Sequence, residues 1–228
     1  MRDIHGKAIL AYHLGNRSME LKLHNSYGPV DHLPIDIFFK ESDDFDDLEK
    51  IALSHCRGTV LDIGAAAGAH ALFLQSCGAN ITALDSSPGC VQTMKLLGIK
   101  NVIQQDYRQH QLTYDTLLLL MNGIGIAGTL VQLPDFFSKC KSLLNDGGQL
   151  ILDSSDIAYL YSDGLAKPKH YYGEIRYRYE YDKEQGDWFD WLYVDPTKLS
   201  LAAQISGFEV EILHTNSNDQ YLAKLQLK

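Results

Sequence analysis

Three carboxylates in the first half of the chain lie in or just after short apolar runs, at a spacing suited to ligand binding. Asp62 lies within the run 60–63, Asp85 ends the run 81–85, and Asp106 follows the run 101–103. If these runs are parallel strands, their carboxyl ends meet at the sheet edge where α/β proteins bind ligands. One carboxylate can accept hydrogen bonds from both ribose hydroxyls. The pattern predicts a nucleoside site, although each aspartate alone can equally be a helix cap or a solvated turn residue.

A loop of small residues connects the first run to a helix predicted over 69–77. Residues 64–68 read Gly-Ala-Ala-Ala-Gly, and small side chains let backbone N–H groups approach a ligand beside a helix N-terminus. The dinucleotide signature G-x-G-x-x-G would need glycine at 66 and 69, where the chain has alanine, and the phosphate-loop sequence G-K-[ST] is absent. The loop therefore favours a nucleoside without phosphates; a tight turn that uses glycine only for packing is the alternative.

The elements that position these residues alternate between strand and helix, which predicts a parallel sheet with helices on both faces. We expect a helix capped by Asp43 or Asp44, another capped by Ser86 or Ser87, and a third over 134–144. The strands predicted for this region are 60–63, 81–85, 101–103, 116–121 and 149–153. A helix to about 206 and the strands 208–213 and 221–227 close the chain.

Two regions depart from this alternation. Residues 3–13 suit a short amphipathic helix, and residues 14–42 are rich in turn formers. Residues 171–182 alternate with period two, and the run 188–194 returns as a hairpin partner. One face of this hairpin is aromatic: Tyr171, Ile175, Tyr177, Tyr179 and Tyr181. That face either covers an acceptor as a lid, with cation–π contact, or packs against the core or a dimer partner.

Composition limits the function classes. The 228 residues carry a net charge of −9 without a basic cluster, which disfavours a nucleic-acid surface. The four cysteines form no CxxC pair, so we expect no metal site and no disulfide, but free thiols in a reducing cytoplasm. No apolar run is long enough for a bilayer, and the first residues lack the apolar core of a signal peptide.

Several segments, taken in order, carry a family resemblance. Residues 60–68 (VLDIGAAAG), 83–89 (ALDSSPG) and 105–107 (QDY) resemble the first three motifs of class I S-adenosylmethionine-dependent methyltransferases. Residues 114–125, 147–152 and 207–210 are similar to later strands of the same family. The resemblance implies an α/β, doubly wound, seven-stranded, mostly parallel Rossmann-like sheet with an antiparallel last strand. The aromatic hairpin would be an insertion in that fold.

The resemblance also implies a site for S-adenosyl-L-methionine. In it the loop lines the methionine part, Asp85 holds the ribose, Asp106 holds the adenine amino group, and Asn122 borders the methyl group. The cofactor residues implied are Asp62, Gly64, Ala65, Ala66, Gly68, Asp85, Ser86, Asp106, Tyr107 and Asn122. Ala66 stands where the family usually has a third glycine, and its methyl group tightens the loop without excluding the cofactor.

The function expected from these features is methyl transfer to a small molecule by a single domain spanning 1–228. Its expected parts are an N-terminal helical cap (1–56), a cofactor-binding core (57–155), the hairpin insertion (156–195) and closing elements (196–228). An NAD(P)-dependent oxidoreductase shares the predicted strand–loop–helix unit, and a non-catalytic S-adenosylmethionine-binding module fits the same motifs. Both remain as alternatives, and a homodimer is possible.

No dedicated catalytic residue follows from the sequence. The transferred methyl group is already reactive, so positioning and exclusion of water can supply much of the catalysis. Four histidines are conceivable bases, but we expect each to be structural or exposed: His5, His13, His70 and His110. The acceptor-side candidates are Tyr12, His13, Tyr177 and Tyr179, together with Tyr107 and Asn122.

Overall fold

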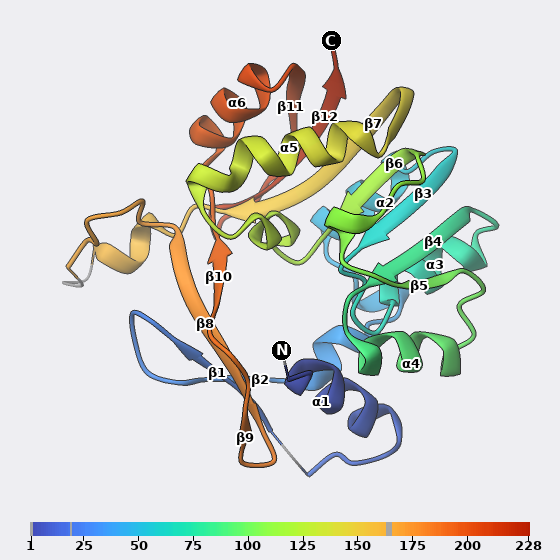
Figure 1. Cartoon of the computed structure of the whole chain (residues 1–228), viewed down its shortest axis with the longest axis vertical. Coiled ribbons are helices and arrows are strands. Elements are labelled where there is room, and N and C mark those ends of the chain that lie inside the picture. The colour runs from blue at the N-terminus through green and yellow to red at the C-terminus, as the bar shows by residue number, and fades with distance from the viewer. Residues whose placement is uncertain (1, 19, 163–165) are drawn as a thin grey trace. The chain divides into compact units, whose positions relative to one another are not determined.

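The computed structural model describes residues 2–18, 20–162 and 166–228. Contacts divide the chain into two units. The first unit contains Met1–Phe45, Thr59–His110 and Tyr177–Phe189, and the second contains Asp46–Gly58, Gln111–Arg176 and Asp190–Lys228. Figure 1 shows the elements of both units along the chain.

A seven-stranded sheet has the order β11-β12-β7-β6-β3-β4-β5. The pairs β3/β4, β4/β5 and β6/β7 are parallel, whereas β12 is antiparallel to both β7 and β11. The strands are β3 (Thr59–Ile63), β4 (Asn80–Asp85), β5 (Val102–Gln104), β6 (Tyr114–Leu119), β7 (Leu144–Ser155), β11 (Phe208–Thr215) and β12 (Gln220–Leu227). The order and directions confirm the predicted fold class, with an antiparallel last strand.

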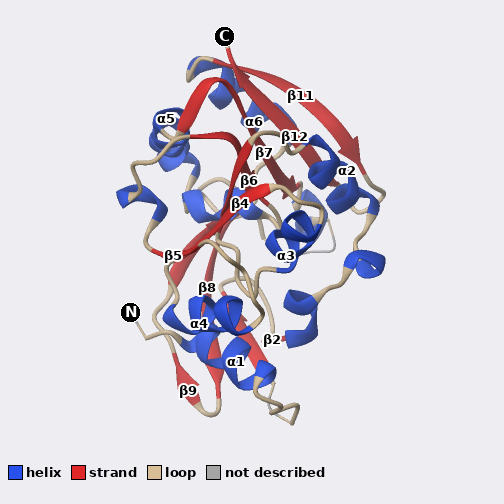
Figure 2. Cartoon of the chain, turned by 90° about the vertical axis from the view of Figure 1, so that its right-hand side faces the viewer, coloured by secondary structure: helices blue, strands red, loops and turns tan. Residues whose placement is uncertain are grey.

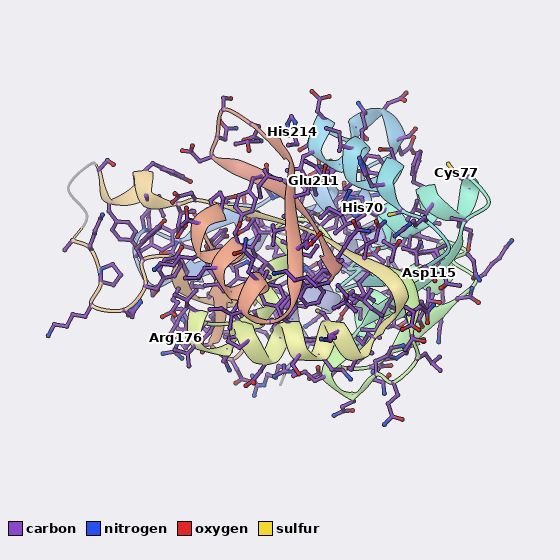
Figure 3. The ribbon with its side chains drawn as sticks, turned by 90° about the horizontal axis from the view of Figure 1, so that it is seen from above. His70, Cys77, Asp115, Arg176, Glu211 and His214 are labelled. Carbon is purple, nitrogen blue, oxygen red and sulfur yellow. The ribbon has the colours of Figure 1, made fainter. Side chains whose placement is uncertain are left out.

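Helices of the first unit begin at recognisable capping residues. Helix α4 (Pro88–Leu96) has Pro88 at its first position and Ser87 as N-cap, whose hydroxyl accepts from the Cys90 N–H at 3.1 Å. Helix α3 (Ala69–Ser76) follows Gly68 and contacts β4. Cys77, which ends it, is exposed (Figure 3). Helix α1 (Ile4–His13) lies against α4 (Figures 1 and 2).

In the second unit, helices α2 (Asp47–His55) and α5 (Leu133–Ser142) lie on opposite sides of β7 and β12 (Figure 2). Helix α6 (Pro196–Ile205) packs on β11 and is capped by Asp195, as the Asp-Pro pair predicts. The prediction that Asp43 or Asp44 caps α2 was wrong. Asp46 caps it, because Asp46 and Glu49 form a reciprocal capping box at 2.8 and 3.0 Å.

A second sheet corrects the prediction for residues 14–42, which form more than turns. Its order is β10-β8-β1-β2, with β9 paired to β8. Its strands are β1 (Leu21–Asn25), β2 (Asp31–Leu33), β8 (Glu174–Tyr181), β9 (Glu184–Gln185) and β10 (Phe189–Leu192). Strand β1 has only five residues, so its local signal is weak; antiparallel pairing with β8, far along the chain, stabilises it.

Short 3-10 turns connect these elements: η1 (Ile35–Phe39), η2 (Ser42–Asp44), η3 (Tyr107–Gln109), η4 (Gly123–Ala127), η5 (Leu130–Gln132) and η6 (Ala158–Tyr161). Turn η1 packs on α1. It contributes Ile35 to a buried cluster that also contains Ile9 of α1, Leu21 of β1 and Tyr181 of β8. The N-terminal segment and the hairpin tip therefore share one core with the loop residue Ala67.

Candidate functional site

The loop after β3 has an unusual backbone. Gly64, Ala66 and Gly68 have φ of 76°, 52° and 84°, in the left-handed region that favours glycine. The N–H of Gly64 donates to the Leu84 carbonyl at 2.8 Å, which ties the loop to β4. A Cβ on Gly68 would overlap the end of the Ile99 side chain, so Ile99 would have to move to accept one. A Cβ on Gly64 would meet nothing within 4 Å, so the loop leaves open space at this position.

Asp85 lies at the end of β4, in contact with that loop. Its Oδ2 accepts from the Ala66 N–H at 2.9 Å and its Oδ1 accepts from the Ser87 N–H at 2.8 Å. Burial raises the pKa of Asp85, and the hydrogen bonds from Ser87 and Ala66 oppose the rise. A carboxylate oxygen can accept more than one hydrogen bond. Both oxygens therefore retain the capacity to accept from a ligand diol.

Asp62 is buried at the end of β3, with 3% of its surface exposed. Among the residues that the structure describes, its Oδ2 has no hydrogen-bond partner. Burial raises its pKa to about 6, and nearby His70 opposes the rise. A buried carboxylate oxygen without a partner is costly, so a cationic or donor group of a ligand would stabilise it.

The third predicted carboxylate forms a local cap. Asp106 Oδ1 accepts from the Arg108 N–H at 2.9 Å and pairs with Arg108 Nε at 3.1 Å. This is the helix-cap role that the sequence left open, and both contacts use the same oxygen. Tyr107 begins η3, with the Arg108 guanidinium 5.6 Å from its ring centroid. Ser86 is exposed beside Asp85.

Asn122 belongs to the second unit and has a left-handed backbone with φ of 57°. Its side-chain Oδ1 accepts from Ser155 Oγ at 3.0 Å. The buried Asp153 accepts from the N–H groups of Asn122 and Gly123 at 2.9 and 3.0 Å. From the sequence, Asp153 is expected only as the last residue of a strand. Like Asp85, it is an aspartate at the end of an apolar run, and this pattern could have identified it as a site residue.

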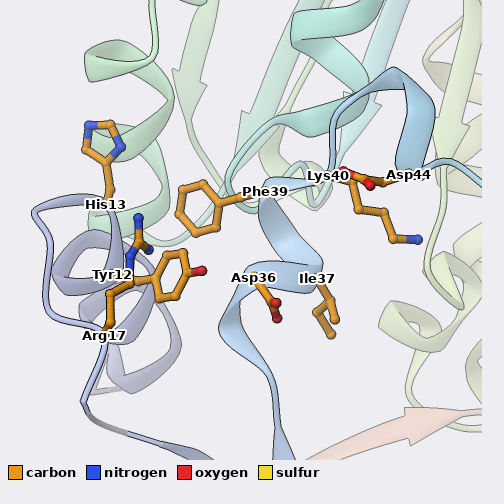
Figure 4. Close-up of a pocket in the computed structure, with 8 residues that line it drawn as sticks. All are labelled: Tyr12, His13, Arg17, Asp36, Ile37, Phe39, Lys40 and Asp44. Carbon is orange, nitrogen blue, oxygen red and sulfur yellow. The ribbon is translucent and has the colours of Figure 1, made fainter.

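Four of the acceptor-side candidates fall into two pairs within the first unit. Tyr12 and His13, at the end of α1, both line a cavity of about 480 Å³ (Figure 4). Tyr177 is buried, and Tyr179 stacks on His5 at 4.9 Å and on Phe189 at 5.3 Å. These two tyrosines of the hairpin face therefore pack within the first unit. A role at the acceptor stays a prediction for all four.

Three of the four histidines considered as bases have structural surroundings, whereas His13 lines the cavity. Burial lowers the pKa of His5 to about 4. His110 is buried and makes a 2.9 Å hydrogen bond to Gln105, and His70 packs against Phe45 with ring centroids 5.2 Å apart. In the described ranges no three His, Cys, Asp or Glu residues form a group that could hold a metal ion. All four cysteines are free thiols.

Comparisons with known proteins identify the family of the chain. The chain is 39% identical to a methyltransferase from Bacteroides fragilis, solved with S-adenosyl-L-homocysteine, with a TM-score of 0.92 over 99% of this chain and 94% of that one. A Streptomyces caelestis methyltransferase, 13% identical, has a TM-score of 0.62 over 81% of this chain and 94% of its own, which is a likeness of fold. The sheet order and the parallel strands define a Rossmann-like α/β protein. The chain belongs to the S-adenosylmethionine-dependent methyltransferases.

Curated relatives match over a shorter stretch. A ubiquinone biosynthesis O-methyltransferase from Xanthomonas oryzae is 30% identical over 102 residues, 42% of this chain and 42% of its own. The match to these curated relatives thus spans about two fifths of their length. No family model matches the chain. Over the described ranges, no helix is both long and apolar enough to cross a membrane.

Proposed function

We propose that this chain, acting as one domain over residues 1–228, transfers the methyl group of S-adenosylmethionine to a small-molecule acceptor. The observation that carries the proposal is the hydrogen bond between Ala66 and Asp85, which holds a strand-end carboxylate beside a loop with open space at Gly64. The unpartnered Oδ2 of Asp62 adds an acceptor for a cationic group. These features suit an adenosine that carries an amino acid and no phosphate.

Different residues of the proposed site would contact different parts of the cofactor. Asp85 would hold the ribose hydroxyls, with Ser86 beside it, and the loop Gly64, Ala65, Ala66 and Gly68 would line the methionine part near Asp62. Asp106 and Tyr107 would border the adenine, and Asn122 would border the methyl group. When bound, the sulfonium supplies a methyl group that is already activated for displacement. The chain's own contribution is to position the acceptor and exclude water.

No residue of the chain is assigned as a general base. A base is required only if the acceptor must lose a proton before or during transfer. The curated relatives are named for methylation of oxygen, but their match covers 42% of each chain, so the acceptor atom does not carry over. Acceptor contacts from Tyr12, His13, Tyr177 and Tyr179 remain part of the proposal.

The setting follows from charge and thiol chemistry. A net charge of −9 opposes a nucleic-acid partner. Four free thiols suit a reducing compartment, so we place the activity in the cytoplasm. The partner that we propose for the activity is the small-molecule substrate. A homodimer is compatible with this proposal.

Transfer of a labelled methyl group tests the proposal directly. Purified protein is incubated with methyl-labelled S-adenosylmethionine and a small-molecule cell extract, with the Asp85→Asn variant as control. At a cofactor concentration below saturation, we expect label in a product of the wild type and several-fold less of it with the variant, because the variant binds the cofactor more weakly. Binding of S-adenosylhomocysteine without any transfer would indicate a non-catalytic binding module. Thermal stabilisation by NADH and not by S-adenosylhomocysteine would indicate an oxidoreductase.

A further inference from the structure

The cavity at the end of α1 is lined by residues from four short stretches of the first unit. Its volume is about 480 Å³, within the range of small-molecule sites. It is lined by the last turn of α1, the segment that follows it, and the turns η1 and η2: Tyr12, His13, Arg17, Asp36, Ile37, Phe39, Lys40 and Asp44 (Figure 4).

One wall of the cavity is aromatic. The rings of Tyr12 and Phe39 have centroids 5.0 Å apart, and the His13 ring lies parallel to Phe39 at 6.4 Å. Tyr12 and Phe39 pack against the buried cluster that contains Ala67, and the loop residue Ala66 packs against the same cluster. The aromatic wall is therefore tied to the loop that we assign to the cofactor.

Two of the four charged side chains that line the cavity, Arg17 and Asp36, have neither an ion pair nor a side-chain hydrogen bond within the described residues, and their charges are opposite. The Arg17 guanidinium lies 3.4 Å from the centroid of the Tyr12 ring. Within the described part of the chain it forms no ion pair, and neither does the Asp36 carboxylate. In Figure 4 they lie on opposite sides of the Tyr12 ring. The other two charged side chains of the lining are already engaged. The Asp44 carboxylate accepts a hydrogen bond from the Glu41 N–H at 3.1 Å, and Lys40 interacts with another group of the protein.

This charge arrangement selects among small ligands. A ligand with only negative groups would be repelled by Asp36, and one with only positive groups would be repelled by Arg17. A ligand with one carboxylate and one amine can pair with both, since a guanidinium binds carboxylates through two N–H donors. The aromatic wall favours an apolar or planar body between those two groups.

We propose that the cavity binds the methyl acceptor, and that this acceptor is a small zwitterion of the amino-acid type, with its carboxylate on Arg17 and its amine on Asp36. This inference rests on the proposed methyltransferase function. It adds the chemical class of the acceptor and two residues that recognise it.

Calorimetric titration with three matched probes tests the inference, using protein saturated with S-adenosylhomocysteine. L-phenylalanine carries both charges, 3-phenylpropanoate lacks the amine, and 2-phenylethylamine lacks the carboxylate. We expect L-phenylalanine to bind at least about tenfold more tightly than either analogue. Arg17→Gln should lower the affinity for L-phenylalanine and for 3-phenylpropanoate about tenfold and leave the affinity for 2-phenylethylamine unchanged. Asp36→Asn should lower the affinity for L-phenylalanine and for 2-phenylethylamine about tenfold and leave the affinity for 3-phenylpropanoate unchanged. The exposed Lys100→Gln is the charge-matched control and should change nothing.

Three results would overturn the inference: no probe binds, all three bind equally, or the Arg17 and Asp36 variants behave like Lys100→Gln. If S-adenosylhomocysteine binds while one of these results is obtained, the proposed methyltransferase function stands and only the acceptor class fails. If the folded protein does not bind S-adenosylhomocysteine, the proposed function fails, and the cavity is then not an acceptor site.

Discussion

The backbone N–H of Ala66 donates to Oδ2 of Asp85 at 2.9 Å, so the loop after β3 and the end of β4 hold each other in place. The other oxygen of Asp85 accepts from Ser87, which caps α4. A single carboxylate thus fixes a strand end, a left-handed loop residue and a helix start. This relationship places a hydrogen-bond acceptor for a sugar beside a backbone that leaves open space at Gly64.

Alanine at Gly64 should block the cofactor without unfolding the protein. Gly64 and Gly78 both have positive φ, at 76° and 82°, and an added Cβ meets nothing within 4 Å at either position. Both substitutions should lower the free energy of unfolding by about 1–2 kcal/mol through backbone strain. Only Gly64→Ala should lower the affinity for S-adenosylhomocysteine, measured by calorimetry, because the methyl group of the new alanine occupies the proposed ligand space. Equal binding by the two variants would contradict the assignment of the loop.

The affinity for S-adenosylhomocysteine should fall at low pH because of Asp62. Its pKa in the free protein is raised to about 6, so the carboxyl is neutral below that pH and ionised above it. The ammonium of the ligand favours the ionised form. Affinity should therefore be full above pH 7 and fall as pH drops through 6, approaching tenfold per pH unit. Asp62→Asn should bind more weakly and lose this dependence; an unchanged pH profile in that variant would refute the assignment.

Local signals in the sequence were sufficient for the elements around the site. The caps Ser87-Pro88 and Asp195-Pro196, and the strand ending in Asp85, are patterns of adjacent residues, and the structure has them. Contacts between distant residues could not be predicted in this way. Strand β1 depends on β8 for its pairing, and neither strand's periodicity identifies its partner.

The same limit applies to the site. The cavity combines Tyr12, Arg17 and Asp36, from a helix, a connecting segment and a 3-10 turn. Only packing of η1 on α1 brings these residues together. Tyr12 is among the acceptor-side candidates named from the sequence, but no spacing rule relates Arg17 to Asp36. Asp106 differs from these residues, because its cap role involves a neighbour two residues along the chain and could be anticipated from the sequence.

Removal of the Asp3 side chain should loosen α1 from α4. Asp3 accepts from the Gly6 N–H at 3.0 Å, the Ser87 hydroxyl at 2.9 Å and the Gly89 N–H at 2.8 Å, so it caps α1 and binds the start of α4. A Cβ on Gly89 would overlap the backbone of Gly6, which shows how closely the helices approach.

We expect Asp3→Ala to cost about 2–3 kcal/mol in urea unfolding, because the Ser87 and Gly89 donors lose their acceptor. Amide exchange over residues 4–13 should become faster. Asp46→Ala is the control, since it removes the cap of α2 alone and should cost about 1 kcal/mol. An Asp3 variant no less stable than the Asp46 variant would show that the contact with α4 contributes nothing.

Asp153 should be required for the loop that carries Asn122. It is fully buried and accepts from Asn122, Gly123 and Gln220 at 2.9, 3.0 and 3.1 Å. Asp153→Asn places an amide donor against these donors, so we expect a loss of about 2–4 kcal/mol in unfolding free energy. Asn122→Ala keeps the backbone contacts and should cost less than about 1 kcal/mol. Similar stability of the two variants would contradict this role.

Calorimetric titration of the wild type and Asp85→Asn with S-adenosylhomocysteine tests the central claim most directly, with the exposed Asp135→Asn as control. We expect the wild type and the control to bind one equivalent with the same affinity. Asp85→Asn should bind at least about tenfold more weakly, because the ribose loses a charged acceptor. Absence of binding by the folded wild type, or wild-type affinity in Asp85→Asn, would contradict that claim.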